Sequence, residues 1–456
     1  MPRRAIYGRI CAVKWLIYNV LFGIAYLATL PSFLLRMKRR GGYRARMGDR
    51  FGRYPSPFTF PPSPIWIHAV SVGEVAVAGQ LMRALRAKDP AIRFVFSTTS
   101  STGWKQAEGQ VGPEDTLIYN PLDFGGCVRR ALDAVRPRAI ILTESEIWPN
   151  FIRAAKKRGV PLFLINARVS DRSAPRYRKL RWFFGEVLRC FTKIFAQSDL
   201  DAKRLTDAGA DPAAVSVTGS FKFDVAKRNP PKEDELRAWI GDGEILLGGS
   251  TWPGEDEALL RIYAELAKTR PDVKLVIAPR HFEKADAVEA NILKEGFGCV
   301  RRSKGVPGAS CLVPSAGLKH EDLRENNVPS TAHQAPVYLC YTTGEMMGLF
   351  GISTVAFVGK SLCEHGSQNM IEPCLCGVPT LVGPYTENFR PVMSDLLAAD
   401  AILQVPDEEA LKGEILRLFA DPEARSALGA RAHAAVERRR GVVDRCADEL
   451  LARLRA

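Results

Sequence analysis

The chain has 456 residues, of which 46% are hydrophobic and 25% are charged. This length is about three times that of a typical domain, so we expect two large domains. The ordinary composition excludes a mostly disordered chain, a collagen-like chain and a polytopic membrane protein. The net charge of +14 belongs to one end, because the first 54 residues hold twelve Lys and Arg against one Asp, which leaves +3 for the rest. A nearly neutral body does not favour a nucleic-acid-binding surface, and we expect no nucleic-acid partner.

Twenty-one uncharged residues lie between Lys14 and Arg36. Twenty residues of helix rise about 30 Å, the thickness of a bilayer's hydrocarbon core. Seven Lys and Arg from Arg36 to Arg50 favour a cytoplasmic position for the body that follows, and they would attract anionic lipid headgroups. We therefore predict that residues 1–40 are a membrane anchor with a basic flank. The alternatives are an amphipathic stretch on the membrane surface and a helix packed on the body, whereas no cleavage site supports a signal peptide.

Short β-branched runs alternate with helical periods in the rest of the chain. Seven such runs fall between residues 65 and 220, and six more fall between residues 244 and 405. Strands separated by helical segments predict parallel βαβ units, and continuous apolar runs indicate strands buried on both faces. We expect an α/β fold of two Rossmann-like, doubly wound domains with a cleft between them, where a ligand binds near the carboxyl ends of the strands.

The predicted boundaries follow the breaks in this alternation. A charged stretch with two consecutive prolines, Pro230 and Pro231, separates the two series of runs and is typical of a linker. Residues 301–336 lack clear periodicity, and we expect a long surface insertion there. The predicted organisation is an anchor over 1–40, an N-terminal domain over 41–226, a linker over 227–243, a C-terminal domain over 244–430 and a C-terminal helix over 431–456.

In the first half, charged side chains follow several of the predicted strands. Because the carboxyl ends of parallel strands meet at one edge of a sheet, we expect these side chains to form a site. Glu74 falls in the first turn of a helix, where it is either a catalytic base or an acid that complements the helix dipole, and the residues alone leave both open. The candidates in this half are Ser71, Gly73, Glu74, Glu144, Arg168 and Lys222.

The second half has residues suited to a phosphate group. Arg280 follows a strand, and arginine holds oxyanions through a planar fork of donors. A glycine-containing loop leads into a helix at about Asn369, whose free amides attract phosphate, and Glu372 one turn later suits ribose hydroxyls. Neither a P-loop nor a GxGxxG opening is present, so ATPases and dinucleotide oxidoreductases are disfavoured. The further candidates are Ser250, His281 and Gly366, although a lone histidine is more often structural.

No run has the spacing of a metal site. The ten cysteines are scattered without a CxxC pair, and we expect them to be reduced thiols. The one D-x-D run, Asp199 to Asp201, follows Ser198, and these residues are more typical of a helix N-terminus, where Ser198 or Asp199 caps and Asp201 complements the dipole. We therefore predict that no metal or other cofactor is required.

Seven runs together resemble the lipopolysaccharide Kdo transferases, which move 3-deoxy-D-manno-octulosonic acid (Kdo) from CMP-Kdo to a lipid A precursor. These runs are HAVSVGEV, TESEIWPN, NARVS, GSFKFD, APRHFE, TTGEM and HGSQNMIEP, and they occur in the family's order. The resemblance extends from about residue 10 to 440. It implies a GT-B glycosyltransferase fold, an inner-membrane anchor with a cytoplasmic catalytic body, and a metal-independent, inverting transfer.

Carried over position by position, the resemblance implies roles for named residues. Glu74 would be the general base, and Glu144 and Lys222 would stabilise the transition state. The residues that would bind CMP are Pro279, Arg280, Thr343, Gly344, Glu345, Asn369, Met370, Ile371 and Glu372. The implied partners are CMP-Kdo, the lipid A precursor and the anionic inner membrane.

The chain departs from the family pattern at two places. Gly366-Ser367 stands where the family usually has Gly-Gly, and the stretch 301–336 has no counterpart that aligns. One alternative function is that of another membrane-associated GT-B glycosyltransferase with a UDP-sugar donor. A basic membrane-bound scaffold is the non-enzymatic alternative.

Overall fold

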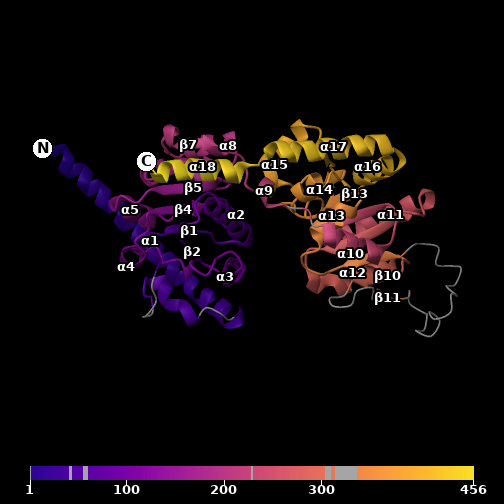
Figure 1. Cartoon of the computed structure of the whole chain (residues 1–456), viewed down its shortest axis with the longest axis horizontal. Coiled ribbons are helices and arrows are strands. Elements are labelled where there is room, and N and C mark those ends of the chain that lie inside the picture. The colour runs from indigo at the N-terminus through magenta and orange to yellow at the C-terminus, as the bar shows by residue number, and fades with distance from the viewer. Residues whose placement is uncertain are drawn as a thin grey trace. The chain divides into compact units, whose positions relative to one another are not determined.

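The computed structural model describes residues 2–40, 44–54, 60–226, 228, 230–302, 310–313 and 336–455. The chain divides into two compact units (Figure 1). The first unit is Met1–Phe221 together with Gly441–Ala456, and the second is Lys222–Arg440. Each unit holds one sheet with helices packed against it (Figure 1).

The first unit has a seven-stranded parallel sheet in the order β3-β2-β1-β4-β5-β6-β7. Every residue of β1, β2, β4, β5 and β6 is buried, as the continuous apolar runs predicted for strands covered on both faces. The strands are β1 (Ile65–His68), β2 (Phe94–Thr98), β3 (Thr116–Tyr119), β4 (Ala139–Thr143), β5 (Leu162–Ala167), β6 (Lys193–Ala196) and β7 (Val215–Val217).

The helices of the first unit are α1 (Pro2–Arg40), α2 (Val72–Lys88), α3 (Ser101–Glu108), α4 (Gly125–Val135), α5 (Pro149–Lys157), α6 (Ala174–Lys179), α7 (Arg181–Leu188), α8 (Asp199–Asp207) and α18 (Val442–Arg455), with short 3-10 helices at Arg44–Phe51 and Pro212–Ala214. Helices α2 to α8 lie between successive strands of this sheet, as βαβ units require, whereas α1 precedes the first strand and α18 returns from the end of the chain. The C-terminal helix α18 packs on α2, where Lys88 Nζ lies 2.7 Å from Asp448 Oδ1.

The N-terminal helix α1 packs one face on the first unit. Trp15 is only 4% exposed, and its ring lies 5.4 Å from that of Phe183 in α7. Tyr18 donates a hydrogen bond to the buried Asp123 at 2.7 Å. By length and composition, the segment Val13–Ser32 is apolar enough to cross a membrane. Its other face leaves large apolar side chains exposed, among them Leu16, Val20, Leu21, Ile24 and Leu27.

The second unit has an eight-stranded sheet in the order β11-β10-β12-β9-β8-β13-β14-β15. All neighbours are parallel except β10 and β11. The strands are β8 (Ile245–Thr251), β9 (Lys274–Pro279), β10 (Cys299–Arg302), β11 (Ser310–Val313), β12 (Val337–Cys340), β13 (Val355–Val358), β14 (Thr380–Val382) and β15 (Leu403–Gln404). The helices are α9 (Lys222–Val225), α10 (Pro230–Ile240), α11 (Glu255–Thr269), α12 (Ala285–Lys294), α13 (Met346–Ile352), α14 (Ile371–Leu375), α15 (Arg390–Ala398), α16 (Glu408–Ala420) and α17 (Pro422–Arg439), with short 3-10 helices at Phe282–Lys284 and Glu387–Phe389.

The structure differs from the expected organisation in three places. The stretch 227–243, expected as a linker, instead holds α10, whose Leu236 and Ile240 are buried in the core of the second unit. Prolines are compatible with the first turn of a helix, because the amide hydrogens there have no helical partner. The expected insertion at 301–336 begins within β10 and contributes β11, which pairs antiparallel with β10, and its residues 303–309 and 314–335 lie outside the described residues. The expected single C-terminal helix over 431–456 is instead the end of α17 and α18, which Gly441 separates at a φ of 80°.

Candidate active site

The first sheet reverses its strand order between β1 and β4, the point at which ligands bind in open parallel sheets. Glu74 lies in the first turn of α2, three residues after the N-cap Ser71. Its carboxylate accepts hydrogen bonds from Val70 N at 2.9 Å, Ser71 Oγ at 3.1 Å and Thr143 Oγ1 at 3.2 Å. Ser71 caps the helix, and Glu74 in the first turn can complement the helix dipole, which was one of the two interpretations. Its carboxylate also joins the residue before the cap to the end of β4.

The next two strand ends are joined by a buried amide. Glu144 and Asn166 both have left-handed backbone, with φ of 49° and 50°. Asn166 is fully buried, and its Nδ2 donates to Glu144 Oε1 at 3.2 Å. Its Oδ1 accepts from Phe221 N at 3.1 Å. One amide thus fixes both the turn that carries Glu144 and the residue that precedes Lys222.

The remaining expected residues of the first half have distinct surroundings. Arg168 is half-buried and donates its backbone N–H to Glu144 O at 3.4 Å. Gly73 is exposed, and a Cβ there would meet nothing within 4 Å. Lys222 opens α9 in the second unit, with Nζ 4.3 Å from the centre of the Phe389 ring. The two expected transition-state residues, Glu144 and Lys222, therefore belong to different units.

In the second unit, several expected residues line one cavity of about 150 Å³. It lies at the carboxyl ends of β8, β9 and β12. The guanidinium of Arg280 is exposed, and within the described ranges it forms no ion pair. An unpaired arginine at a strand end suits a phosphate oxyanion. The expected residues in the lining are Ser250, Pro279, Arg280, Thr343 and Gly344, and the others are Ala278, Cys340, Tyr341, Thr342 and Met346.

Glu345, expected beside CMP, has its carboxylate directed into the unit. It is 5% exposed and accepts bidentate hydrogen bonds from Arg302 at 3.0 to 3.1 Å. It also pairs with Lys232 Nζ at 2.9 Å and with the hydroxyl of Thr342. Burial opposes its ionisation, but these hydrogen bonds outweigh burial and lower the pKa of Glu345 to about 2. Its carboxylate therefore holds the turn that presents Thr343 and Gly344 to the cavity.

In the expected run from Asn369 to Glu372, two side chains lie in the core and two bond to each other at the start of the helix. Met370 and Ile371 are fully buried, and their side chains pack in the hydrophobic core of the unit. Asn369 Nδ2 donates to Glu372 Oε1 at 2.9 Å, and burial raises the pKa of Glu372. The helix begins at Ile371 rather than at Asn369 and is only five residues long. Gly366 has a φ of 119°, and a Cβ there would collide with Asn388.

Strained backbone marks one expected residue and one that the sequence reasoning missed. Ser250, a candidate from the sequence, has a φ of 54° near the end of β8, and Lys360, which was not among the candidates, has a φ of 58° after β13. The second sheet reverses its order between these two strands, and such conformations in residues other than glycine gather at functional sites. Lys360 Nζ lies 4.7 Å from the centre of the Trp252 ring. Lys360 directly follows a run that we identified as a strand, and that position is the signal that could have revealed it.

The His281 ring lies against Trp252, with 5.0 Å between the ring centres. Asp201, in the D-x-D run, accepts hydrogen bonds from Val169 N at 2.9 Å and from Ser198 Oγ at 2.5 Å, and Ser198 is the N-cap of α8. In the parts of the chain that the structure describes, no three His, Cys, Asp or Glu side chains gather as a metal-ligand cluster.

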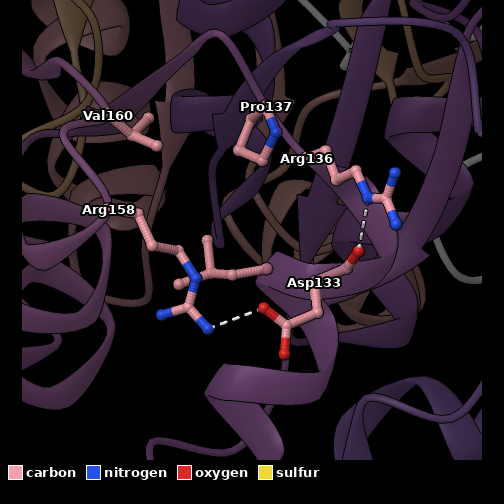
Figure 2. Close-up of a pocket in the computed structure, with 6 residues that line it drawn as sticks. Asp133, Arg136, Pro137, Arg158 and Val160 are labelled. Carbon is pink, nitrogen blue, oxygen red and sulfur yellow. Dashed lines mark hydrogen bonds and ion pairs between the residues drawn. The ribbon is translucent and has the colours of Figure 1, made fainter.

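A second hollow, of about 380 Å³, lies before β4 and β5, at the ends of the strands opposite to Glu74. Figure 2 shows its two facing side chains, Asp133 and Arg158, paired with each other. Arg158 Nη2 lies 2.7 Å from Asp133 Oδ1, and Arg136 Nε donates to the backbone oxygen of Asp133 at 3.1 Å. The facing charges of Asp133 and Arg158 therefore pair with each other, and none of the expected site residues lines this hollow.

Comparisons with known proteins agree on one family. A family model described as 3-deoxy-D-manno-octulosonic-acid transferase (kdotransferase) matches residues 45–225. A 3-deoxy-D-manno-octulosonic acid transferase of Haemophilus influenzae is 32% identical over 412 residues, 90% of this chain and 91% of that protein. Its counterpart in Bordetella pertussis is 34% identical over 436 residues, 91% of this chain and 94% of that protein.

Among solved structures, UDP-GlcNAc 2-epimerase from Neisseria meningitidis bound to UDP-GlcNAc has a TM-score of 0.57. It is 14% identical, and the match covers 86% of this chain and 99% of that one. At this identity the likeness shows the fold alone. It confirms the predicted GT-B-like α/β architecture of two wound sheets.

Proposed function

The chain belongs to the Kdo transferases, the glycosyltransferase family of lipopolysaccharide synthesis, and from that premise we propose that it transfers Kdo from CMP-Kdo to a lipid A precursor. One observation carries the proposal. The seven runs that resemble the family lie far apart in the chain, yet each follows a strand of a parallel sheet in one unit or the other. Carboxyl ends of strands are where wound α/β domains bind their ligands.

The reaction requires a base and a group that stabilises the leaving group. CMP is an activated leaving group, so the enzyme must accept a proton from the acceptor hydroxyl and stabilise the departing phosphate. In the proposal Glu74 accepts that proton while the hydroxyl oxygen bonds to the anomeric carbon of Kdo, and the bond from that carbon to the CMP oxygen breaks with inversion. Among the residues that the structure describes, only the exposed Ser71 hydroxyl donates to Glu74 Oε1, which leaves that oxygen a lone pair for the proton.

The second unit would hold the donor. Arg280 supports this assignment, because it is exposed at the cavity that Ser250, Thr343 and Gly344 also line. A planar guanidinium pairs with a phosphate through two parallel hydrogen bonds. We assign the stabilisation of developing charge to Glu144 and Lys222 on the resemblance to the family.

No residue in this assignment needs a metal, so we expect transfer to persist in excess chelator. Activity restored only by added Mg²⁺ would contradict this.

The anionic inner membrane is the proposed location, with the catalytic body on the cytoplasmic side. The exposed apolar face of α1 supports this, and so does the adjoining pair α6 and α7, because Phe183 of α7 packs on Trp15 of α1. Beside that contact Trp182 is 57% exposed. Cations around an exposed tryptophan suit an anionic lipid surface. The exposed cations of this region are Arg172, Arg176, Arg178, Lys179, Arg181 and Arg189.

The test is an assay of the purified full chain with CMP-Kdo and tetraacylated lipid A precursor in detergent micelles. Mass spectrometry of the lipid reports whether Kdo is added and how many residues are added. A parallel reaction with a UDP-hexosamine donor tests the alternative glycosyltransferase. Transfer from CMP-Kdo supports the proposal, and transfer from the UDP-sugar alone would overturn it.

A further inference from the structure

The second sheet places a lysine at the point where its strand order reverses. β8 and β13 are neighbours there, and Gly359 N donates to Gly249 O at 2.9 Å just before Lys360. Lys360 then takes a left-handed φ of 58°. Lysine rarely adopts this conformation, so the surrounding structure must hold it in place.

A buried carboxylate holds this strained turn. Glu255, at the start of α11, is fully buried and accepts from the backbone N–H of Lys360 at 2.8 Å, Ser361 at 2.9 Å and Leu362 at 2.9 Å. It also accepts from Trp252 N at 2.9 Å. Four amides thus satisfy the charge of Glu255, and the turns after β8 and β13 are fixed to each other. The backbone from which the Lys360 side chain extends is therefore held by a buried support.

The ammonium group of Lys360 rests on an indole ring rather than on an acid. Its Nζ lies 4.7 Å from the Trp252 ring centre, and within the described residues it has no carboxylate within 4.0 Å. A cation–π contact orients an ammonium without neutralising it. The same indole packs on His281, 5.0 Å between ring centres, and His281 directly follows Arg280. Trp252 therefore contacts Lys360, after β13, and the residue next to Arg280, after β9, and neither cation has an acidic partner among the described residues.

We propose that Lys360 binds the carboxylate of the transferred sugar acid, while Arg280 binds the phosphate of the same donor. The inference rests on the proposed function. In CMP-Kdo the sugar carboxylate is attached to the carbon that bears the phosphate oxygen, so the donor presents two anions a few bonds apart. Each anion needs a charged donor of its own. Lys360 would then distinguish an acidic sugar donor from a neutral one, and Trp252 would be its positioning residue.

Lys360→Gly tests the proposal without endangering the fold. Glycine adopts a φ of 58° without strain, so we expect the variant to melt at the same temperature as the wild type or higher. Binding of CMP and of CMP-Kdo is measured by calorimetry without acceptor. We expect affinity for CMP-Kdo to fall on the order of tenfold and affinity for CMP to change by less than about twofold. Lys360→Arg keeps the charge and should keep most of the affinity for CMP-Kdo.

Arg280→Ala is the matched comparison, because it should weaken CMP and CMP-Kdo alike. Unchanged binding of CMP-Kdo to Lys360→Gly would overturn the proposal, and so would an equal loss of CMP and CMP-Kdo. Failure of the wild-type chain to bind CMP-Kdo, with binding of a UDP-sugar instead, would refute the proposed function itself. Binding of CMP-Kdo by the wild type with no effect at Lys360 refutes only the carboxylate assignment.

Discussion

Glu74 and Thr143 are joined by a hydrogen bond of 3.2 Å from Oγ1 to Oε2, which links the first turn of α2 to the end of β4. Those two elements flank the point where the first sheet reverses its order. The same carboxylate accepts from Val70 N, just before the N-cap of α2. Glu74 therefore stabilises the fold at the position where the proposed chemistry needs a base. An informative variant must keep these hydrogen bonds and remove the base.

Glu74→Gln meets that requirement. The amide oxygen of glutamine can still accept from Val70 N and Thr143 Oγ1, and its NH2 group can donate to Ser71 Oγ, so we expect the melting temperature to stay within a few degrees of the wild type. An amide oxygen cannot take the proton of the acceptor hydroxyl, and the transfer rate should fall by roughly 10² to 10⁴. Affinity for CMP should not change. The measurements are initial rates with CMP-Kdo, thermal melting and a CMP titration.

Glu74→Ala is the control for the hydrogen bonds. It removes the base and these bonds together and should lower the free energy of unfolding by about 1 to 3 kcal/mol in addition to abolishing transfer. If Glu74→Gln kept nearly the full transfer rate while Glu74→Ala lost it, the residue would have a structural role and would not be a base.

Asn166 gives a second prediction, about the turn that carries Glu144. Asn166→Gly keeps the left-handed backbone and removes the hydrogen bonds to Glu144 Oε1 and Phe221 N. We therefore expect the free energy of unfolding to fall by about 1 to 3 kcal/mol. Asn166→Ala removes the same bonds and adds the strain of a Cβ, which should cost roughly 1 kcal/mol more. Denaturant unfolding of both variants measures the difference. Equal stabilities would show that the left-handed backbone relaxes in the variant.

The strand ends could be predicted from sequence because buried parallel strands are continuous apolar runs that stop at polar residues. That rule located Glu74, Glu144 and Arg280 near the ends of β1, β4 and β9. The surroundings of Glu345 could not be predicted. Its main partner, Arg302, lies 43 residues earlier, at the start of a stretch without periodicity, so only the pairing of β10 with β12 brings them together.

The spacing of apolar residues did not predict which side chains face the core in a run that also resembles a ligand-binding segment. Met370 and Ile371 stand in a run that resembles a nucleotide-binding segment, but their side chains fill the core under it. A five-residue helix is too short for its apolar face to be recognised from spacing. Lys360 was missed because its left-handed φ is imposed by Glu255, 105 residues earlier in the chain. Contacts over such separations are set by the tertiary fold and leave no local pattern.

Glu345→Gln should destabilise the second unit. The substitution leaves the buried Arg302 with Glu235 as its remaining acidic partner. We therefore expect the free energy of unfolding to fall by about 3 kcal/mol, which is at the low end for a broken buried ion pair. The pKa of Glu345 lies below its ordinary value of 4.5, at about 2, so the pair's contribution is present above pH 4.5 and is lost as the pH falls toward 2. Acid unfolding followed by circular dichroism should be less steep in Glu345→Gln. An identical acid profile would contradict the assignment.

Asp256 should produce the opposite dependence on pH. It is 3% exposed in the first turn of α11, and burial, together with the neighbouring Glu257 and Glu255, raises its pKa from 3.8 to about 7. The native state then binds a proton that the unfolded chain has released, so stability falls as the pH rises from 3.8 to about 7. Asp256→Asn removes that titration, and its stability relative to the wild type should increase through this window and level off above it. Melting temperatures across the window measure the effect, with the exposed Asp242→Asn as the matched control. A gain for Asp256→Asn that did not vary with pH would show that Asp256 stays ionised in the folded protein.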